Sequence, residues 1–236
     1  MKSLPITLIL SLLFSFISVS QNHSQIYNIK NDKILHLYES SIHNQYDYVI
    51  GKEYKPYHYY KQDNPYLNSG LGSGYIYYNG RSYRTKIIYY DLFTDEVIIN
   101  INNKTANSNL IQINKTQIDS FSINFGIRDY NFTYLKQPKN IASGFYETIY
   151  NQKLKLLIRH SAKKLKIKSL TTYKYKQTIY LKRNKKFHDI SSPKKFLSLF
   201  PENSKPLRKK LKLLEINFKK PSHSKLINLI KYAETL

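Results

Sequence analysis

The sequence predicts an α+β fold, in which a mainly antiparallel β meander, a curved sheet or a partly closed barrel, precedes short C-terminal helices. Between residues 74 and 190, short runs of alternating apolar and polar residues follow one another, separated by turn signals. From residue 191 the apolar residues recur instead at the spacing of amphipathic helices. With 41% hydrophobic and 14% aromatic residues, the chain has enough apolar material for one globular domain.

The first 20 residues have the features of a secretory signal peptide. Met1-Lys2 supplies a positive start, residues 4–19 are apolar and uncharged, and Ser18-Val19-Ser20 offers small residues for cleavage. The alternative is a membrane anchor, but no basic stop-transfer cluster follows. We therefore expect an exported mature chain of residues 21–236, in the periplasm, associated with the outer membrane, or secreted.

Residues 21–73 form a polar segment that is rich in Tyr and Pro and precedes the β domain. Pro and Gly residues between positions 46 and 73 favour ordered loops over a long helix. Gly70-Leu71-Gly72-Ser73-Gly74 is interpreted as a flexible linker. It is not interpreted as a phosphate-binding loop, because it precedes a strand and lacks the Lys-Ser/Thr ending.

The β domain, residues 74–190, opens with the clearest local signal. Asn79-Gly80 lies between two β-rich runs within residues 74–91, which is typical of a type I′ hairpin turn. Further strands are predicted over 96–102 (half-buried, with Val97, Ile99 and Ile101 inward), around 111–113, 121–123 and 132–134, over 145–150 and 154–159 (with Leu157 outward), and over 166–175 and 177–183, before a turn at Asn184-Lys185.

Three amphipathic helices are predicted in the C-terminal segment, residues 191–236. Ser192-Pro193 begins the first helix, which ends before Pro201, and Ser204 and Ser222 begin the other two. The apolar stripes of the second and third helices are Leu207, Leu211, Leu214 and then Leu226, Leu229, Ile230, Ala233. We expect the helices to pack together or on the sheet, with their basic faces in solvent.

Positive charge is concentrated near the C-terminus. Residues 21–150 hold 13 Lys and Arg against 11 Asp and Glu, whereas residues 151–236 hold 24 against 4. Such a field attracts polyanions, and candidate contacts are Arg208, Lys209, Lys212, Lys219 and Lys220. The alternative is a compositional bias toward residues with AT-rich codons. Such a bias raises Lys throughout and does not by itself produce this asymmetry.

Several phrases of the chain, taken together, resemble a known family. They are Gly51-Lys52-Glu53-Tyr54, Asn64-Pro65-Tyr66-Leu67, GYIYYNGRSY at residues 74–83, Gly144-Phe145-Tyr146-Glu147 and Phe200-Pro201. The family is one of uncharacterised exported proteins common in Bacteroidota. The resemblance implies export and a single domain, and it implies no catalytic residue. This chain departs from the family pattern because it has no Trp between residues 67 and 74.

The sequence contains no strong signal for catalysis or metal binding, and no cofactor is expected. The absence of Cys excludes disulfides, thiolate metal sites and cysteine nucleophiles. Of the seven His, none has a second His at i, i+4. His36 and His43 could share a helix face with Glu39, but we interpret the histidines as solvated.

Three carboxylates and two serines are the nearest approach to a catalytic pattern. Asp91, Asp95 and Glu96 surround one predicted turn and could form a calcium or catalytic corner. We favour a structural interpretation, in which Asp91 caps a strand end and Asp95 hydrogen-bonds its own turn. Ser161 beside His160, and Ser191 near His188-Asp189, lie in no Gly-x-Ser-x-Gly elbow.

The leading hypothesis is a non-enzymatic exported protein of the cell envelope that acts as an interaction or structural subunit. It would dock on an envelope protein or an outer-membrane assembly through a tyrosine face, with Tyr75, Tyr77, Tyr78 and Tyr83 as candidate interface residues. Tyrosine is also simply a good strand former. One alternative is a peripheral binder of anionic lipid, lipopolysaccharide or acidic glycan that uses the basic C-terminal third. Nucleic acid is the least expected partner, and a hydrolase is the second alternative.

Overall fold

The computed structural model describes residues 51–57, 63–100, 110–168 and 170–236. These residues belong to one compact unit, Val49–Leu236. The predicted signal peptide and the His36, Glu39 and His43 group lie outside the described residues.

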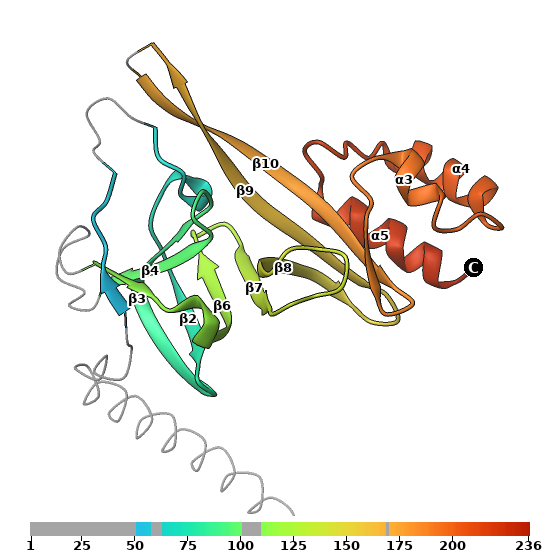
Figure 1. The fold of residues 1–236 in the computed structure, drawn as a ribbon. Coiled ribbons are helices and arrows are strands. Elements are labelled where there is room, and N and C mark those ends of the chain that lie inside the picture. The colour runs from blue at the N-terminus through green and yellow to red at the C-terminus, as the bar shows by residue number, and fades with distance from the viewer. Residues whose placement is uncertain (1–50, 58–62, 101–109, 169) are drawn as a thin grey trace, which may run out of the picture. The chain divides into compact units, whose positions relative to one another are not determined.

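The described residues form one antiparallel sheet, curved but not closed, followed by helices (Figure 1). The strands are β1 (Gly51–Glu53), β2 (Gly72–Tyr78), β3 (Arg81–Asp91), β4 (Glu96–Asn100), β5 (Leu110–Ile113), β6 (Ile118–Asn124), β7 (Asp129–Leu135), β8 (Gly144–Asn151), β9 (Lys155–Ile167), β10 (Leu170–Arg183) and β11 (Lys186–Asp189). The helices are α3 (Pro193–Leu197), α4 (Ser204–Leu214) and α5 (His223–Glu234), with single 3₁₀ turns η2 (Leu67–Ser69) and η3 (Lys115–Gln117). The predicted α+β class is confirmed in these broad terms.

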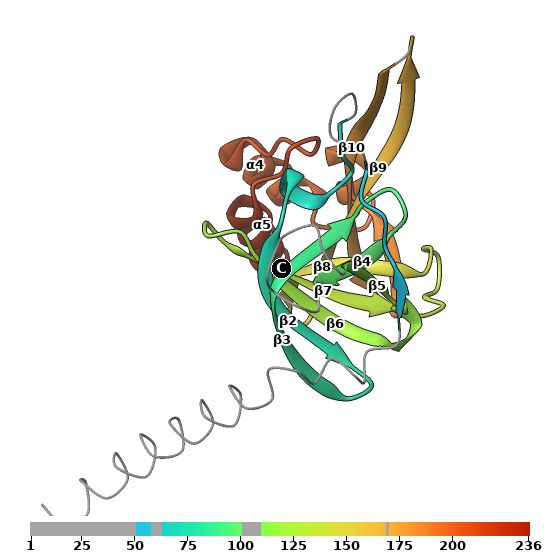
Figure 2. The ribbon, with the colours of Figure 1, turned by 90° about the vertical axis from the view of Figure 1, so that its left-hand side faces the viewer.

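The strand order departs from a simple meander. The sheet runs β1-β5-β4-β3-β2-β6-β7-β8-β9-β10-β11. The chain moves outward from β2 to β5 and then returns to place β6 on the other edge of β2, as two roughly perpendicular views show (Figures 1 and 2). Two meanders, β2 to β5 and β6 to β11, therefore join at the β2–β6 pair.

Two glycines make this join sterically feasible. A Cβ at Gly74 would collide with the carbonyl oxygen of Ser122 in β6, and a Cβ at Gly72 would collide with the Ile123 side chain. Both glycines lie within β2. The interpretation of residues 70–74 as a flexible linker is therefore wrong from Gly72 onward, and the first strand of this meander begins two residues before the predicted domain boundary.

The β2–β3 hairpin is confirmed in its turn and register. Asn79 and Gly80 have φ values of 49° and 74°, and Tyr78 lies opposite Arg81. Positive φ at both central residues is the requirement of a type I′ turn, which Asn and Gly meet at little steric cost.

Two predictions of half-buried strands are wrong because β4 and the first half of β9 are buried on both faces. In β4 the residues Val97, Ile98, Ile99 and Asn100 are all buried, and Ile98 packs in a cluster with Tyr66. Leu157 in β9 was expected to face outward but is fully buried, opposite Thr148 and Tyr180.

β9 and β10 form a single long hairpin rather than the predicted pair of strands over 166–175 and 177–183. The pairing runs without interruption from Ile167↔Leu170 to Lys155↔Lys182. Residues 170–183 contain many β-branched and aromatic residues and no Gly, Pro or Asn, so nothing in them favours a turn. The predicted turn at Asn184-Lys185 is confirmed, with φ values of 51° and 64°.

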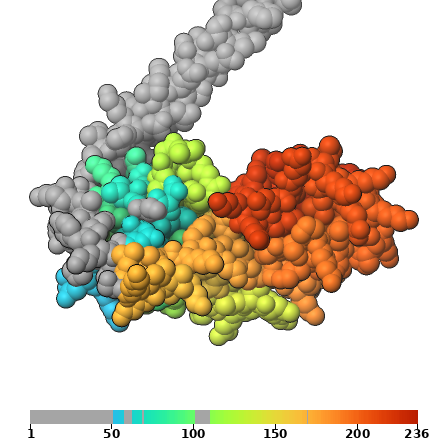
Figure 3. All heavy atoms as spheres, turned by 90° about the horizontal axis from the view of Figure 1, so that it is seen from above, coloured from blue at the N-terminus to red at the C-terminus, as the bar shows by residue number. Residues whose placement is uncertain are grey.

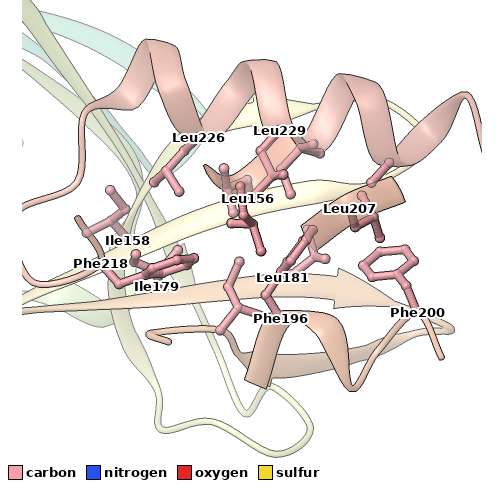
Figure 4. Packing of buried hydrophobic residues seen from close by; sticks show 14 residues of the cluster. Leu156, Ile158, Ile179, Leu181, Phe196, Phe200, Leu207, Phe218, Leu226 and Leu229 are labelled. Atoms are coloured by element: carbon pink, nitrogen blue, oxygen red, sulfur yellow. The ribbon is translucent and has the colours of Figure 1, made fainter. Parts of the chain in front are cut away.

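The helices pack on β8, β9 and β10 through one apolar cluster, which we call the helix–sheet core (Figure 4). Figure 3 shows the helices, in red, beside β9 and β10, in orange. The buried members of the core are Leu156, Ile158, Ile179, Leu181, Ile190, Phe196, Phe200, Leu207, Leu211, Phe218, Leu226, Leu229, Ile230 and Ala233. Full burial of one such large apolar side chain contributes about 1.5–3 kcal/mol.

Local hydrogen bonds fix the ends of the helical segment. The Ser192 hydroxyl accepts the Lys195 N–H (3.3 Å), which confirms the predicted N-cap of α3. At the end of α5, Glu234 accepts the Tyr150 hydroxyl (2.6 Å) and the Leu154 N–H (2.7 Å). The last helix is therefore tied to the turn between β8 and β9. No helix of the described residues is long and apolar enough to cross a bilayer.

Removal of one buried leucine should reveal how much the helix–sheet core contributes to stability. Leu207→Ala deletes a fully buried side chain of α4, so we expect the free energy of unfolding to fall by about 2–5 kcal/mol. Leu213→Ala, on the exposed side of the same helix, should change it by less than about 0.5 kcal/mol. Urea denaturation of both variants measures the difference, and equal values would contradict this packing.

Candidate functional site

A polar network with a buried centre lies where the N-terminus of α5 meets the sheet. Its members, which we call the Glu147 network, are Arg128, Glu147, His160, Tyr175 and His223. Glu147 is on β8, His160 on β9 and Tyr175 on β10, while Arg128 lies in the turn before β7 and His223 is the first residue of α5. The side chains of Glu147 and His160 are almost wholly buried.

The hydrogen bonds of this network define the role of each group. His160 Nε2 lies 2.6 Å from Glu147 Oε2, and His160 Nδ1 contacts the Tyr175 hydroxyl. Arg128 Nη2 donates to Glu147 Oε1 (3.2 Å). Because the carboxylate accepts from Nε2–H, Nδ1 of a neutral imidazole is left to accept the Tyr175 hydroxyl proton. Glu147 is thereby bonded through both of its oxygens.

His223 connects this network to the last helix. Arg128 Nη1 lies 2.8 Å from His223 Nδ1, and since a guanidinium can only donate, this nitrogen acts as the acceptor. Burial lowers the pKa of His223, and the positive charge of Arg128 acts in the same direction, while Glu147 opposes it. The ring is therefore held neutral near pH 7, as its acceptor role requires.

The network does not have the features of an activated nucleophile. Desolvation raises the pKa of the Tyr175 hydroxyl above its usual range, so this group stays protonated and donates. The Ser161 hydroxyl donates to the Lys176 carbonyl oxygen (3.4 Å), and the Ser191 hydroxyl accepts the Ile179 N–H (3.1 Å). The structure therefore gives neither serine a hydrogen bond to the histidine that the sequence places near it.

The prediction that the histidines are solvated is wrong for His160, which is 2% exposed. His188 and His223 are partly buried. A signal for His160 was present in the sequence, since a period of two from the inward Leu156 and Ile158 places His160 on the same face. The partners Arg128 and His223 are 95 residues apart, and no sequence pattern links them.

Asp91, the last residue of β3, caps the strand end as predicted, whereas Asp95 does not hydrogen-bond its own turn. Asp91 Oδ1 accepts the N–H groups of Phe93 (2.8 Å) and Thr94 (3.1 Å), so Asp91 holds the turn. Its Oδ2 accepts the hydroxyls of Tyr57 (2.8 Å) and Tyr54 (3.2 Å). Both bonds to the turn and both bonds to tyrosines identify Asp91 as a structural anchor.

Asp95 contacts four parts of the chain, β3, η3, β8 and β9, instead of its own turn. Its carboxylate accepts the Tyr90 hydroxyl (2.7 Å) and the Phe145 N–H (3.4 Å), and it lies 4.0 Å from Arg159 and 3.8 Å from Lys115. Burial raises the pKa of Asp95, although these bonds and charges counteract the effect. No cluster of three or more His, Asp or Glu placed to hold a metal ion occurs among the described residues.

The four tyrosines predicted as an interface do not share one exposed face. Tyr75 and Tyr77 are 43% and 46% exposed, whereas Tyr78 is 1% exposed, and its hydroxyl contacts Gln117. Tyr83 lies opposite Ile76, so it belongs to the other face of the hairpin from Tyr75 and Tyr77. Two of the four residues therefore remain as an outward pair.

The five cations predicted to bind polyanions are all exposed. Arg208, Lys209 and Lys212 lie on α4, and Lys219 and Lys220 lie in the segment between α4 and α5. The structure records no ion pair for any of the five with a carboxylate of the described residues. Their charges are therefore free to act on an external anion.

An open groove of about 770 Å³ lies between α3, α4 and residues 215–218. Its lining combines apolar side chains with charged ones, which are Leu197, Leu211 and Phe218, and Lys194, Arg208, Lys212 and Glu215. Two of the predicted polyanion contacts, Arg208 and Lys212, thus line the groove. The groove extends the same cationic surface.

Comparisons of the chain with models of known families, with characterised proteins and with solved structures found no match. The family resemblance inferred from the sequence therefore stays a prediction. Function is inferred instead from the geometry and the charge described above.

Neutralising Glu147 should destabilise the protein, because Gln removes the negative charge beside Arg128 and replaces one of the two acceptor oxygens by a donor. We expect Glu147→Gln to lower the free energy of unfolding by about 3–5 kcal/mol, as when one partner of a buried ion pair is removed. Glu202→Gln, at an exposed position, is the matched control and should have little effect. Thermal or urea unfolding measures both, and an unchanged stability of Glu147→Gln would contradict a structural role of the network.

Proposed function

We propose that the protein is a peripheral binder of polyanions and that its basic C-terminal third is the binding surface. The observation that carries the proposal is the uncompensated charge of residues 151–236, which hold 24 Lys and Arg against 4 Asp and Glu. A charge density of this sign and size attracts anions over several ångströms of solvent and raises their association rate.

The few carboxylates of this segment do little to neutralise it. Asp189 is engaged by Lys195, and Glu234 accepts bonds from Tyr150 and Leu154. Glu202 and Glu215 are the other two acidic residues, against the remaining cations. The charge of the segment is thus directed outward, where an external anion can meet it.

Packing holds these cations in fixed positions. The helix–sheet core buries one face of α4 and α5, so the opposite faces, with Arg208, Lys209 and Lys212, point away from the sheet. A surface whose backbone is already ordered loses less entropy on binding than a disordered basic tail. This arrangement supports a binding role over a purely compositional excess of lysine.

The protein would act after export, as its N-terminal sequence predicts. The anions available outside the cytoplasm include lipid headgroups, lipopolysaccharide phosphates and acidic glycans. In this proposal the protein binds without catalysis, as an interaction subunit of the cell envelope.

A second candidate function is docking on an envelope protein through tyrosines. The observation in its favour is the outward pair Tyr75 and Tyr77, which lies on β2 beside Ser120 and Ser122 of β6. Exposed tyrosines are enriched in protein interfaces. Because Tyr78 is buried in the core, only two of the four predicted tyrosines are available for such docking. We therefore rank docking through tyrosines below binding through the cationic surface.

Sedimentation of the mature chain with vesicles tests the proposed function. We expect binding to vesicles of phosphatidylglycerol in phosphatidylcholine and to the sulfated glycan heparin, with clear weakening between about 50 mM and about 300 mM salt. Replacing Arg208, Lys209, Lys212, Lys219 and Lys220 together by Gln should weaken binding about a hundredfold or more, since each nearby cation contributes about 1 kcal/mol.

The matched control removes five exposed lysines from the rest of the described chain. Lys52, Lys55, Lys86, Lys136 and Lys139 are exposed and lie before residue 151. Their replacement by Gln makes the same change in net charge and should leave most of the binding intact. An equal loss of binding affinity in the two variants would refute the proposal. Binding that is independent of both salt concentration and lipid charge would also refute it.

A further inference from the structure

We infer that the outer half of the β9–β10 hairpin is a membrane-docking arm, whose apolar tip enters an anionic bilayer while its lysines bind the headgroups. The arm comprises residues 163–168 and 170–176. Both ribbon views show this half of the hairpin projecting beyond the neighbouring strands (Figures 1 and 2). The inference rests on the proposed function and names the lipid bilayer as its partner.

The charge of the arm is of one sign. Its six lysines are Lys163, Lys164, Lys166, Lys168, Lys174 and Lys176, and all of them are exposed. The chain has no Asp or Glu between Glu147 and Asp189, so neither strand supplies a carboxylate to pair with these lysines. Asp63, in the segment beside the arm, donates its main-chain N–H to the Thr171 carbonyl (3.3 Å).

Two of the lysines face each other in a way that weakens the free hairpin. Lys163 and Lys174 are directly opposite in the register, and like charges in that position destabilise a strand pair. An anionic surface beside them relieves the repulsion. The pair is therefore better suited to a bound state than to isolated protein in water.

The tip of the arm is apolar. Ile167 and Leu170 are directly opposite each other at the last pair before the turn, and they are 58% and 45% exposed. Side chains alternate between the two faces along each strand, and directly opposite residues share a face. Ile167, Leu170 and Leu165 therefore lie on the same face of the hairpin. Paired branched side chains at the end of a projecting strand pair form a small apolar wedge.

The spacing of charge and apolar residues fits a bilayer interface. At about 3.3 Å per residue, Lys163 and Lys174 lie roughly 13 Å back from the tip pair, and Lys166 and Lys168 flank the tip itself. Apolar groups of interfacial proteins enter roughly 5–10 Å into the headgroup and acyl boundary. The tip can therefore be immersed while the lysines reach the phosphates.

The arm is braced against the rest of the protein, which gives it a fixed direction. The ring of Tyr173 packs edge-on against Tyr57 (5.6 Å) and Phe93 (5.7 Å). Closer to the sheet, the Tyr175 hydroxyl contacts His160 of the Glu147 network. An ordered arm of this kind presents its tip without a prior folding cost.

A protective role for the lysines is the simpler interpretation, because charged residues on projecting strands prevent edge-to-edge pairing. That role explains the six lysines. It does not explain the exposed Ile167 and Leu170, because polar residues at these two positions would prevent association better. Acidic glycans or nucleic acid would likewise use the lysines and gain nothing from an aliphatic tip. The combination favours a lipid surface.

A single tryptophan introduced at the tip tests the inference directly, because the natural chain has none. Leu170→Trp in the mature protein should show a blue-shifted emission on phosphatidylglycerol–phosphatidylcholine vesicles, and quenching by lipids brominated on the acyl chain. It should show neither effect on heparin. Ile127→Trp, at an almost fully exposed position in the turn before β7, is the matched control and should keep its solvent-exposed emission.

Vesicle sedimentation of two further variants completes the test. Ile167→Ser with Leu170→Ser should weaken vesicle binding about tenfold or more, and leave heparin binding unchanged. Lys163→Gln with Lys174→Gln should weaken vesicle binding by about 25-fold, against little effect for Lys136→Gln with Lys139→Gln. Circular dichroism of each variant confirms that it is folded.

The outcomes separate the inference from the proposed function. Vesicle binding that persists with an unshifted emission of the Leu170→Trp protein and an unaffected serine variant of the tip would overturn the arm inference and leave polyanion binding in place. Absence of binding to both vesicles and heparin would overturn both. Equal loss of heparin and vesicle binding in the serine variant would also overturn the inference, because it would indicate a general effect on the arm.

Discussion

The packing of three helices on β8, β9 and β10 is the interaction on which the rest of this structure depends. The helix–sheet core takes side chains from all three helices and from β9 and β10. It buries the apolar stripe of each long helix and, since the stripes are narrow, leaves the cationic faces outside. Without this core, α4 would be an isolated helix of 11 residues, which is too short to be stable in water.

Two polar contacts set the position of α5 on that core. His223 at its start meets Arg128 and the Glu147 network, and Glu234 at its end accepts bonds from the turn between β8 and β9. A carboxylate at a helix C-terminus is unfavourable to the helix dipole, so its retention indicates that the bonds to Tyr150 and Leu154 outweigh that cost. Apolar burial supplies the affinity of helix for sheet, and these end contacts restrict how the helix lies.

Local structure was predictable where a few neighbouring residues decide it. The Asn79-Gly80 and Asn184-Lys185 turns, the Ser192 cap and the stripes of α4 and α5 follow from backbone preferences and from helical spacing, and all are found as predicted. The pairing of β6 with β2 was not predictable. It depends on Gly72 and Gly74 facing a strand that begins some 40 residues later, and the same glycines also fit a linker.

The candidate sites follow the same division. Exposure of Arg208 and its four cationic neighbours could be predicted from the amphipathic pattern of α4 and the polar segment after it. The Glu147 network could not, because it gathers a turn, three strands and a helix. The tyrosine face was wrong at Tyr78, because the period of two along β2 places Tyr78 with the buried Ile76, on the face opposite Tyr75 and Tyr77. Which side of a strand is buried depends on what packs against it, and the sequence of the strand alone does not contain that information.

Native-state hydrogen exchange tests most directly whether the cationic helices and the sheet form one cooperative structure. Buried amides of α5, such as those of Leu229 and Ile230, should open with the same free energy as those of Ile158 in β9 and Ile179 in β10. Exchange of the α5 amides at a much lower free energy, with the strand amides still protected, would contradict the account, because the helices would then open without disturbing the sheet.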